Sequence, residues 1–358
     1  MGALRKSSVT GAFTQQGPKL SLVSCESAGD CWQDASTGPA FVPARGLSNC
    51  HLQTLIGTFF AQRPLVVGTT QRKLRLNDDD FLILHDDRPA AWQRGDHVVL
   101  LMHGLAGCHD SGYMVRTTSK LNDRGVRVFR MDHRGCGAGA ALAKSPYHAG
   151  RTQDLDDAVR MVERLCPGSP ISIAGYSISG NLVLKYLGEY ADEIPLSVFR
   201  AVAVCPPIDL QHCVEALDHG RINQQYNWYF TRQLLSMVTR GPLWRPDVPL
   251  AKSRRMPSRL FEFDDLYTAP ASGYDSAEHY YREASAINVI SKIRVHTTIL
   301  ASADDPLVCP APLRSATLPT NVKVCMTNQG GHLGFLGRPG CDPDSRWMDW
   351  RVIDWLLQ

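Results

Sequence analysis

The stretch from residue 171 to residue 187 constrains the fold more than any other part of the chain. Residues 171–174 are small or β-branched, which is typical of a buried strand, and apolar residues recur at helical spacing over 182–187. A Gly-x-Ser turn with Ser177 at its end joins the two segments. Such a turn lifts a serine hydroxyl out of a sheet, so the pattern predicts a nucleophile at Ser177.

Further apolar runs predict a sheet. Strands are expected at 98–102, 126–131, 171–174, 201–205, 296–301 and 322–326, after a hairpin formed by 73–76 and 81–84. The six runs are continuous rather than alternating, as expected where helices cover both faces of a sheet. Helical patterns lie between the strands, for example at 154–165, and a last helix is expected at 347–357. This alternation predicts an α/β fold with a doubly wound, mostly parallel sheet.

The alternation of strands and helices breaks between about residues 211 and 285. Aromatic residues are frequent there and no strand pattern is evident, which favours a mainly helical insertion. Ligands of open α/β sheets bind at the carboxyl edge of the strands, so we interpret the insertion as a lid, with a peripheral helical decoration as the alternative. Residues 1–38 lack apolar periodicity and are expected to form a loosely ordered arm. One domain is therefore expected over 39–358.

A serine hydroxyl is a weak nucleophile, so Ser177 needs a general base. His332 fits this role, because a predicted strand at 322–326 and a Gly-Gly loop deliver its imidazole near the end of the chain. Histidine suits proton transfer since its pKa lies near neutrality. We therefore expect His332 to accept the proton of Ser177.

An acid that orients the imidazole is expected in the loop after the strand at 296–301. Asp304 and Asp305 are adjacent there, and their side chains should point in different directions. We favour Asp305, because the acid that orients a catalytic histidine often precedes an apolar pair and then a proline, as in residues 305–310. Asp304 is the alternative, with capping of the loop as its other role.

A tetrahedral intermediate at Ser177 needs two backbone N–H groups to bind its oxyanion. One is expected at Ile178, directly after the nucleophile, where the positive end of the helix dipole also points. The second is expected at Leu105, in the His-Gly-Leu turn that ends the strand at 98–102. The alternative interpretation is that this His-Gly pair forms only a turn and has no catalytic role.

A metal site has weaker support in the sequence than the arrangement of Ser177, Asp305 and His332. The strongest candidate ligands are five side chains near the same sheet edge: His103, His109, Asp110, Asp132 and His133. No pair has an established ligand spacing such as His-Glu-x-x-His. We therefore interpret residues 132–137 as a structural turn and expect neither a metal nor another cofactor.

The composition excludes several classes of function. A formal net charge of +3 over 358 residues is too small to favour a nucleic-acid partner. Eleven cysteines, an odd number without a Cys-x-x-Cys pair, argue against a disulfide framework and favour a reducing cytoplasm. The sequence has no secretory signal and no apolar run of ~20 residues, so no integral membrane segment is expected.

These residues together resemble the YheT-like branch of the α/β-hydrolase superfamily, which includes embryogenesis-associated and abhydrolase-domain hydrolases. The resemblance spans about residues 40–340 and rests on the motifs at 49–54, 103–105, 134–137, 175–177, 263–270, 304–306 and 330–335. The chain order of serine, aspartate and histidine is also that of α/β-hydrolases. The sequence departs from the family pattern at Ser179, where glycine is usual, and at Cys50, where proline is common.

The resemblance implies a carboxylic-ester hydrolase that needs no cofactor and uses a triad of Ser177, Asp305 and His332. Its implied substrates are short-chain esters or acyl lipids. A thioesterase or an acyltransferase on the same residues is one alternative. A catalytically silent protein that binds ligands with the same fold is another, and the serine at position 179 gives it some support.

Overall fold

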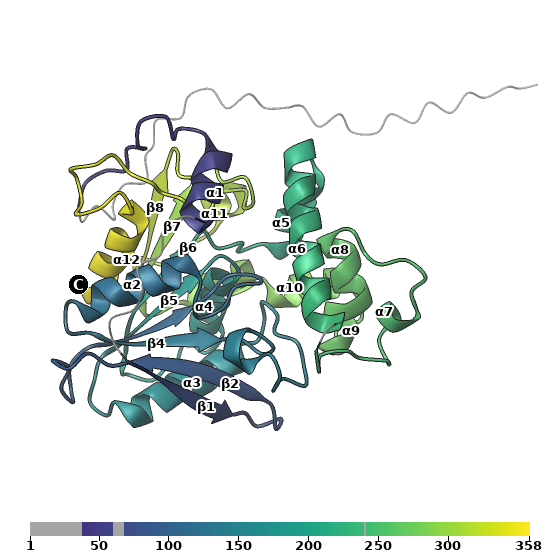
Figure 1. The fold of residues 1–358 in the computed structure, drawn as a ribbon, viewed down its shortest axis with the longest axis horizontal. Coiled ribbons are helices and arrows are strands. Elements are labelled where there is room, and N and C mark those ends of the chain that lie inside the picture. Colours follow the sequence, from purple (N-terminus) through teal and green to yellow (C-terminus); the bar gives the residue numbers. More distant parts are fainter. Residues whose placement is uncertain (1–37, 60–67, 240) are drawn as a thin grey trace, which may run out of the picture. The chain divides into compact units, whose positions relative to one another are not determined.

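The computed structural model of the chain describes residues 38–59, 68–239 and 241–358 and contains an eight-stranded sheet (Figure 1). The strands are β1 (Thr69–Arg75), β2 (Phe81–Asp87), β3 (Val98–Met102), β4 (Arg127–Asp132), β5 (Ile171–Tyr176), β6 (Val198–Val204), β7 (His296–Ser302) and β8 (Val322–Thr327). They lie in the order β1-β2-β4-β3-β5-β6-β7-β8. The β1–β2 and β2–β4 pairs are antiparallel and the other five are parallel. The predicted α/β class with a mostly parallel sheet is confirmed.

The strands predicted from the sequence are all present, and their bounds differ by a few residues. The largest difference is at β1, which begins at Thr69 rather than at residue 73. Strand β6 ends at Val204, so Cys205 falls outside it, with a positive φ of 48°. The strand therefore ends where the backbone leaves the extended conformation. The apolar side chain of Cys205 gave no sign of this change, so the predicted strand was one residue too long at this end.

Helices cover both faces of the sheet, as the continuous apolar strands predict. They are α2 (Gly112–Asn122), α3 (Thr152–Leu165), α4 (Ile178–Glu189) and α12 (Trp347–Leu357). Successive side chains of a strand point to opposite faces. Leu100 therefore packs into the core with α3 and α4, whereas Val99 and Leu101 pack into the core with α2 and α12. Figure 1 shows α2 and α12 together, away from α3.

The chain between β6 and β7 is helical in its described residues and contains no strand there. The helices are α5 (Leu210–Asp218), α6 (Arg221–Thr239), α7 (Pro249–Lys252), α8 (Leu260–Phe263), η2 (Asp264–Thr268), α9 (Ala269–Ala271), α10 (Ala277–Ala284), η3 (Ala286–Asn288) and η4 (Ile290–Lys292). Figure 1 shows α5 to α10 grouped beside the sheet, on the right of the view. They share a separate apolar core that includes Leu234, Phe263 and Tyr281.

Three further elements complete the described structure: α1 (Cys50–Phe59), η1 (Gly137–Gly139) and α11 (Ala311–Ser315). The arm expected at residues 1–38 lies outside the described residues, apart from residue 38. Across the described ranges, none of the helices combines the length and the apolar character that crossing a membrane requires.

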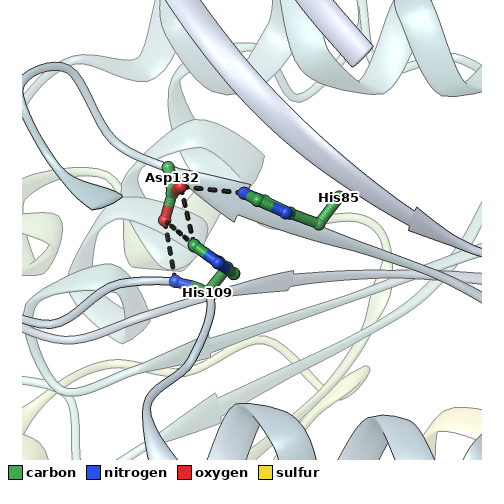
Figure 2. Close-up of side chains that lie close together, drawn as sticks. All are labelled: His85, His109 and Asp132. Atoms are coloured by element: carbon green, nitrogen blue, oxygen red, sulfur yellow. Dashed lines mark hydrogen bonds and ion pairs between the residues drawn. The ribbon is translucent and has the colours of Figure 1, made fainter. Parts of the chain in front are cut away.

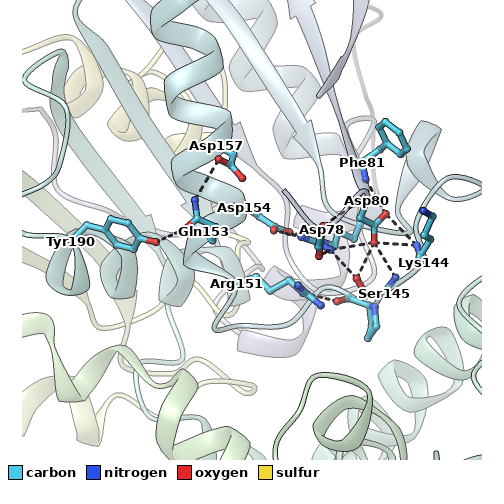
Figure 3. Close-up of polar contacts among 12 residues, drawn as sticks. Asp78, Asp80, Phe81, Lys144, Ser145, Arg151, Gln153, Asp154, Asp157 and Tyr190 are labelled. Carbon is cyan, nitrogen blue, oxygen red and sulfur yellow. Dashed lines mark hydrogen bonds and ion pairs between the residues drawn. The ribbon is translucent and has the colours of Figure 1, made fainter. Parts of the chain in front are cut away.

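A buried arginine ties the β1–β2 hairpin to the rest of the domain through three aspartates, Asp78, Asp80 and Asp154, which Figure 3 labels. Arg134 donates to both carboxylate oxygens of Asp154, at 2.7 and 2.6 Å, and also to Asp78 and Asp80 in the hairpin turn. The Asp80 carboxylate accepts a further hydrogen bond from the Ser145 hydroxyl, at 2.8 Å. The turn after β4 therefore anchors the antiparallel edge of the sheet to α3.

Candidate active site

Ser177 lies in a sharp turn between β5 and α4, with a positive φ of 55° and a ψ of −121°. Residues other than glycine adopt such a backbone at a cost, and strain of this kind concentrates at functional sites. Gly175 makes the turn possible, because a Cβ atom there would lie 2.1 Å from the Ser179 carbonyl oxygen. The predicted nucleophile is thus held at the carboxyl end of a central strand and at the start of a helix.

Ser179 stands where the family pattern has glycine, and hydrogen bonds accommodate its side chain. Its hydroxyl donates to the His103 carbonyl oxygen at 2.5 Å and therefore accepts from His133 Nε2 at 2.7 Å. Gly180, the next residue, also lies close to its neighbours, because a Cβ atom there would lie 3.0 Å from Pro206 Cβ in the loop after β6 and 3.3 Å from the Gly175 carbonyl oxygen. Ser179 thus fits the elbow and connects α4 to the loop after β3.

The structure brings the His332 imidazole between Ser177 and Asp305. Nε2 lies 2.9 Å from Ser177 Oγ, and Nδ1 lies 2.8 Å from Asp305 Oδ2. The other carboxylate oxygen, Oδ1, accepts from the backbone N–H groups of Leu307 and Val308 at 2.8 and 3.0 Å. The imidazole and the carboxylate are both buried. This geometry allows a proton to pass from the hydroxyl to a ring whose orientation the carboxylate fixes.

The two adjacent aspartates have different partners. Asp305 contacts the His332 ring, whereas Asp304 Oδ1 accepts from the Ser302 hydroxyl at 2.5 Å and from the Gly331 N–H at 2.9 Å. Asp304 therefore links the end of β7 to the loop that carries the histidine. The structure places Asp305, the favoured candidate, at the imidazole and gives Asp304 a bracing role.

Helix α1 supports the histidine loop, a contact that sequence reasoning did not identify. Gly331 has a φ of +58°, and a Cβ atom there would lie 2.3 Å from the Cys50 carbonyl oxygen. Thr54 Oγ1 accepts a hydrogen bond from the backbone N–H of His332 at 2.9 Å. The motif at 49–54 was the available signal, but no local pattern indicates that it reaches a loop near the other end of the chain.

The loop after β3 is fixed on both sides of Leu105. The Gly104 N–H donates to the Tyr113 hydroxyl, and the Ala106 N–H donates to the Tyr147 hydroxyl, each at 2.9 Å. The Leu105 N–H lies between these two bonds and has no protein acceptor within the described part of the chain. Tyr113 and Tyr147 were not predicted as site residues, because only the folded loop brings them to these amides.

Ile178 offers a second unpaired N–H group, since it is the first residue of α4 and no acceptor for it occurs among the described residues. The loop after β3 approaches the nucleophile closely, because a Cβ atom at Gly104 would lie 3.1 Å from Ser177 Cβ. The predicted pair, Leu105 and Ile178, therefore belongs to two elements that meet at the serine.

Two cavities meet at Ser177 and His332. The first encloses about 980 Å³, including space open to solvent, and is lined mainly by apolar side chains of α5, α6, α8 and α10. The second encloses about 1300 Å³ on the same basis and is bounded by α1, α6 and the loop after β3. Its lining includes polar side chains such as Thr58 and Gln225. The serine is thus accessible from a largely apolar cavity and from a more polar one.

Two of the candidate metal ligands form a hydrogen-bonded cluster with His85 (Figure 2). Asp132 accepts from His85 Nε2 at 2.9 Å and from His109 Nδ1 at 2.8 Å. Burial opposes ionisation of Asp132, but hydrogen bonds from His109 and His85 hold its pKa far below the usual range. The two rings stack, with centroids 3.5 Å apart and planes at 11°. Both ring nitrogens point at the same carboxylate oxygen, Asp132 Oδ2, so hydrogen bonds account for the position of all three side chains.

The remaining candidate ligands lie elsewhere. His103 accepts through its carbonyl oxygen from the Ser179 hydroxyl, and His133 Nε2 donates to that hydroxyl. Burial lowers the pKa of both imidazole rings. Both are therefore neutral near pH 7. Asp110 is exposed and pairs with His109 Nε2 at 3.2 Å. These contacts fit the interpretation of residues 132–137 as a structural turn.

Comparison with protein families supplies an independent result. A model described as the alpha/beta hydrolase fold matches residues 97–339. The chain is 32% identical to YheT of Escherichia coli (strain K12) over 329 residues, which cover 90% of this chain and 94% of that protein.

Two eukaryotic relatives match over a shorter region. The chain is 29% identical to medium-chain fatty acid ethyl ester synthase/esterase 2 of Saccharomyces cerevisiae, over 67% of this chain and 58% of that protein. It is 30% identical to phospholipase ABHD3 of Mus musculus, over 66% of this chain and 58% of that protein. The chain thus spans somewhat over half the length of these two relatives.

Solved structures share the fold. The esterase Pf2001 of Pyrococcus furiosus superposes with a TM-score of 0.54 at 15% identity, covering 90% of this chain and 98% of that chain. A 2,6-dihydroxy-pseudo-oxynicotine hydrolase gives a TM-score of 0.54 at 16% identity, covering 82% and 69%. At these identities the likeness concerns the fold alone.

Proposed function

Because the chain belongs to the α/β-hydrolase fold family, as a YheT-like member, we propose that it hydrolyses carboxylic esters with Ser177 as the nucleophile. The observation that carries the proposal is the position of the His332 imidazole, which bridges Ser177 Oγ and the Asp305 carboxylate at 2.9 and 2.8 Å. The names of its relatives, an esterase and a phospholipase among them, identify the chain as a hydrolase and support an ester as the substrate.

The proposed reaction has two half-reactions. Ser177 Oγ attacks the ester carbonyl carbon while His332 Nε2 takes the hydroxyl proton, and the alcohol then leaves with that proton. The acyl group stays on the serine until a water molecule, deprotonated by the same imidazole, attacks the acyl carbon. The bond from that carbon to Ser177 Oγ then breaks, the imidazolium returns the proton to Oγ, and the carboxylic acid leaves. Asp305 keeps Nδ1 protonated and stabilises the imidazolium that forms in each step.

The N–H groups of Leu105 and Ile178 bind the oxyanion of each tetrahedral intermediate. Their lack of other acceptors supports this role, since a donor already engaged in the protein would first have to break a bond. Fixed backbone donors stabilise the developing charge without reorganising, and removing one such donor elsewhere costs about 10²–10³-fold in kcat.

The two cavities suggest how an ester lies at the serine. We assign the acyl chain to the apolar cavity under α5 to α10 and the alcohol to the more polar cavity beside α1. On this assignment the helices at about 211–285 act as a cap on the domain at 39–358. The name of the yeast relative, which refers to medium-chain fatty acid ethyl esters, agrees with an apolar acyl site.

A fluorophosphonate probe tests the proposal, because it phosphonylates only an activated serine. We expect the wild-type protein to be labelled at Ser177 and the Ser177→Ala variant to remain unlabelled. Turnover of p-nitrophenyl esters from acetate to palmitate then measures the depth of the acyl cavity as a chain-length limit. A folded protein that is neither labelled nor active on any ester would instead be a catalytically silent binding protein.

A further inference from the structure

The apolar cavity beside Ser177 contains an acidic side chain that the proposed reaction does not use. Asp264 lines the same cavity as Ser177 and His332, and it is the one acid among the described lining residues. An acyl chain that extends from Ser177 Oγ into this cavity would therefore share the cavity with the Asp264 carboxyl group. Apolar side chains make up most of the remaining wall, so the group needs a separate explanation.

An irregular helical turn in the cap determines where the Asp264 side chain points. Asp264 opens η2, a π-helical turn of five residues between α8 and α9. A π-turn adds a residue to the helical turn, changes the direction of its side chains, and is frequent at functional sites. Phe263 and Tyr267 anchor the turn as buried members of the cap core, and Thr268 also lines the cavity.

The partners of Asp264 leave it partly unsatisfied. Its Oδ2 accepts from the Tyr281 hydroxyl at 2.7 Å, and the Thr268 side chain is also hydrogen-bonded to it. No basic side chain in the described ranges is paired with it. Burial raises the pKa of Asp264 to about 6, and the hydrogen bonds from Thr268 and Tyr281 oppose the rise. A carboxylate has about four acceptor sites and these two donors occupy two of them, so the half-buried side chain can accept further hydrogen bonds where it lines the cavity.

These free acceptor sites make the cavity selective. A plain alkyl chain that displaces water from Asp264 leaves them without a hydrogen-bond donor, which is costly for a polar group. A hydroxyl on the chain satisfies one of them. A site that holds a substrate hydroxyl in this way rejects the analogue without it far more strongly than an apolar pocket rejects an extra methylene.

We propose that Asp264, with Tyr281 and Thr268, forms a polar subsite that selects esters whose acyl chain carries a hydroxyl group. The inference rests on the proposed ester hydrolysis and on the assignment of the acyl chain to this cavity. It names hydroxyacyl esters as the substrate class and makes Asp264 a specificity residue that does not take part in the chemical steps.

The test compares medium-chain p-nitrophenyl esters with hydroxyl-bearing counterparts of equal length. The hydroxyl is moved along the chain, beyond the carbons from which it would cyclise, and kcat/KM is measured for each ester. At one position we expect the wild-type protein to prefer the hydroxyl ester by about tenfold or more, as for other sites that bind a substrate hydroxyl. Equal kcat/KM at every position would overturn the inference.

Two variants locate the preference. Asp264→Leu should abolish it and favour the plain ester, whereas Asp264→Asn keeps size and one acceptor oxygen and should reduce it. Asp265→Asn, in the same turn but exposed, is the matched control and should retain it. The preference is the ratio of kcat/KM for the hydroxyl ester to kcat/KM for the plain ester, measured within one variant. A general loss of activity lowers both values and leaves this ratio unchanged. A preference that survives both Asp264 variants would overturn the assignment.

The remaining outcomes are also decisive. A preference for an amino-substituted chain over the hydroxyl chain would overturn the hydroxyl assignment in favour of a cation. Probe labelling of Ser177 and turnover of plain esters without hydroxyl preference would overturn this inference and leave the proposed function standing. Absence of both labelling and turnover would overturn the two together.

Discussion

The Ser179 hydroxyl donates a hydrogen bond to the His103 carbonyl oxygen and so connects the helix after the nucleophile to the loop that carries Leu105. The same hydroxyl accepts from His133, whose ring stacks on Tyr147 at an interplanar angle of 9°. Tyr147 in turn holds the N–H of the residue after Leu105. The departure from the family's glycine is therefore part of a buried polar network that positions one proposed oxyanion donor.

Replacing Ser179 by alanine should impair the chemical step more than binding. The loop loses its bond to α4, and the buried His133 N–H loses its acceptor, so the Leu105 N–H is held less firmly. We expect kcat for p-nitrophenyl butyrate to fall about tenfold with little change in KM, as for a lost transition-state interaction. Ser315→Ala, on the exposed surface of α11, is the control. An unchanged kcat would contradict the positioning role.

The adjacent aspartates provide a matched pair for the triad. Asp305→Asn should lower kcat by about ten-thousandfold, the scale observed when a serine protease loses its orienting carboxylate. Asp304→Asn retains an oxygen for the Gly331 N–H, so a loss below about tenfold is expected. Steady-state kinetics on a short-chain ester checks both variants. Similar losses in the two would leave the orienting acid unassigned.

The sequence was informative where local periodicity determines structure. Continuous apolar runs predicted the strands, because a strand buried on both faces needs no polar alternation. The Gly-x-Ser turn and the Gly-Gly-His loop could also be identified, since each is a short segment next to a strand. Ser177 and His332 could therefore be put forward as candidate site residues before the contact between them was known.

Contacts between distant segments were not predictable in this way. The hydrogen bond from His332 to Thr54 joins residues 278 positions apart, and no local pattern encodes that pairing. The position of Asp264 in the cavity depends on a π-turn, which has no characteristic spacing of apolar residues. Ser179 was identified only as a departure from the family's glycine, because its acceptor lies in the loop after a different strand.

The stability of the antiparallel edge should depend on Arg134. Arg134→Ala leaves the buried carboxylates of Asp154 and Asp80 without their cation, and breaking a buried pair in this way costs about 3–5 kcal/mol of unfolding free energy. Arg294→Ala is the control, because Arg294 pairs with Asp192 on the surface and should cost less than about 1 kcal/mol. Urea unfolding measures both. Equal losses would show that the hairpin contacts contribute little.

The pH dependence of stability offers a test of Asp264 that needs no substrate. Burial raises its pKa to about 6 in the folded protein, against hydrogen bonds from Thr268 and Tyr281, whereas an aspartate in an unfolded chain titrates near pH ~4. Between these values the folded state binds more protons than the unfolded state. This group therefore makes the unfolding free energy decrease as pH rises from about 4 to about 6, by at most about 3 kcal/mol.

Asp264→Asn removes this titration. The unfolding free energy of the variant minus that of the wild-type protein should therefore be larger at pH 7.5 than at pH 4.5, because these pH values lie on either side of the folded-state pKa of about 6. Urea unfolding at both pH values gives the two differences, and contributions from every other titrating group cancel between them. Asp265→Asn serves as the control for an amide in the same turn. A difference that stays constant with pH would mean that the Asp264 carboxyl is solvated like a surface group, which would also remove the reason for its selectivity toward a hydroxyl.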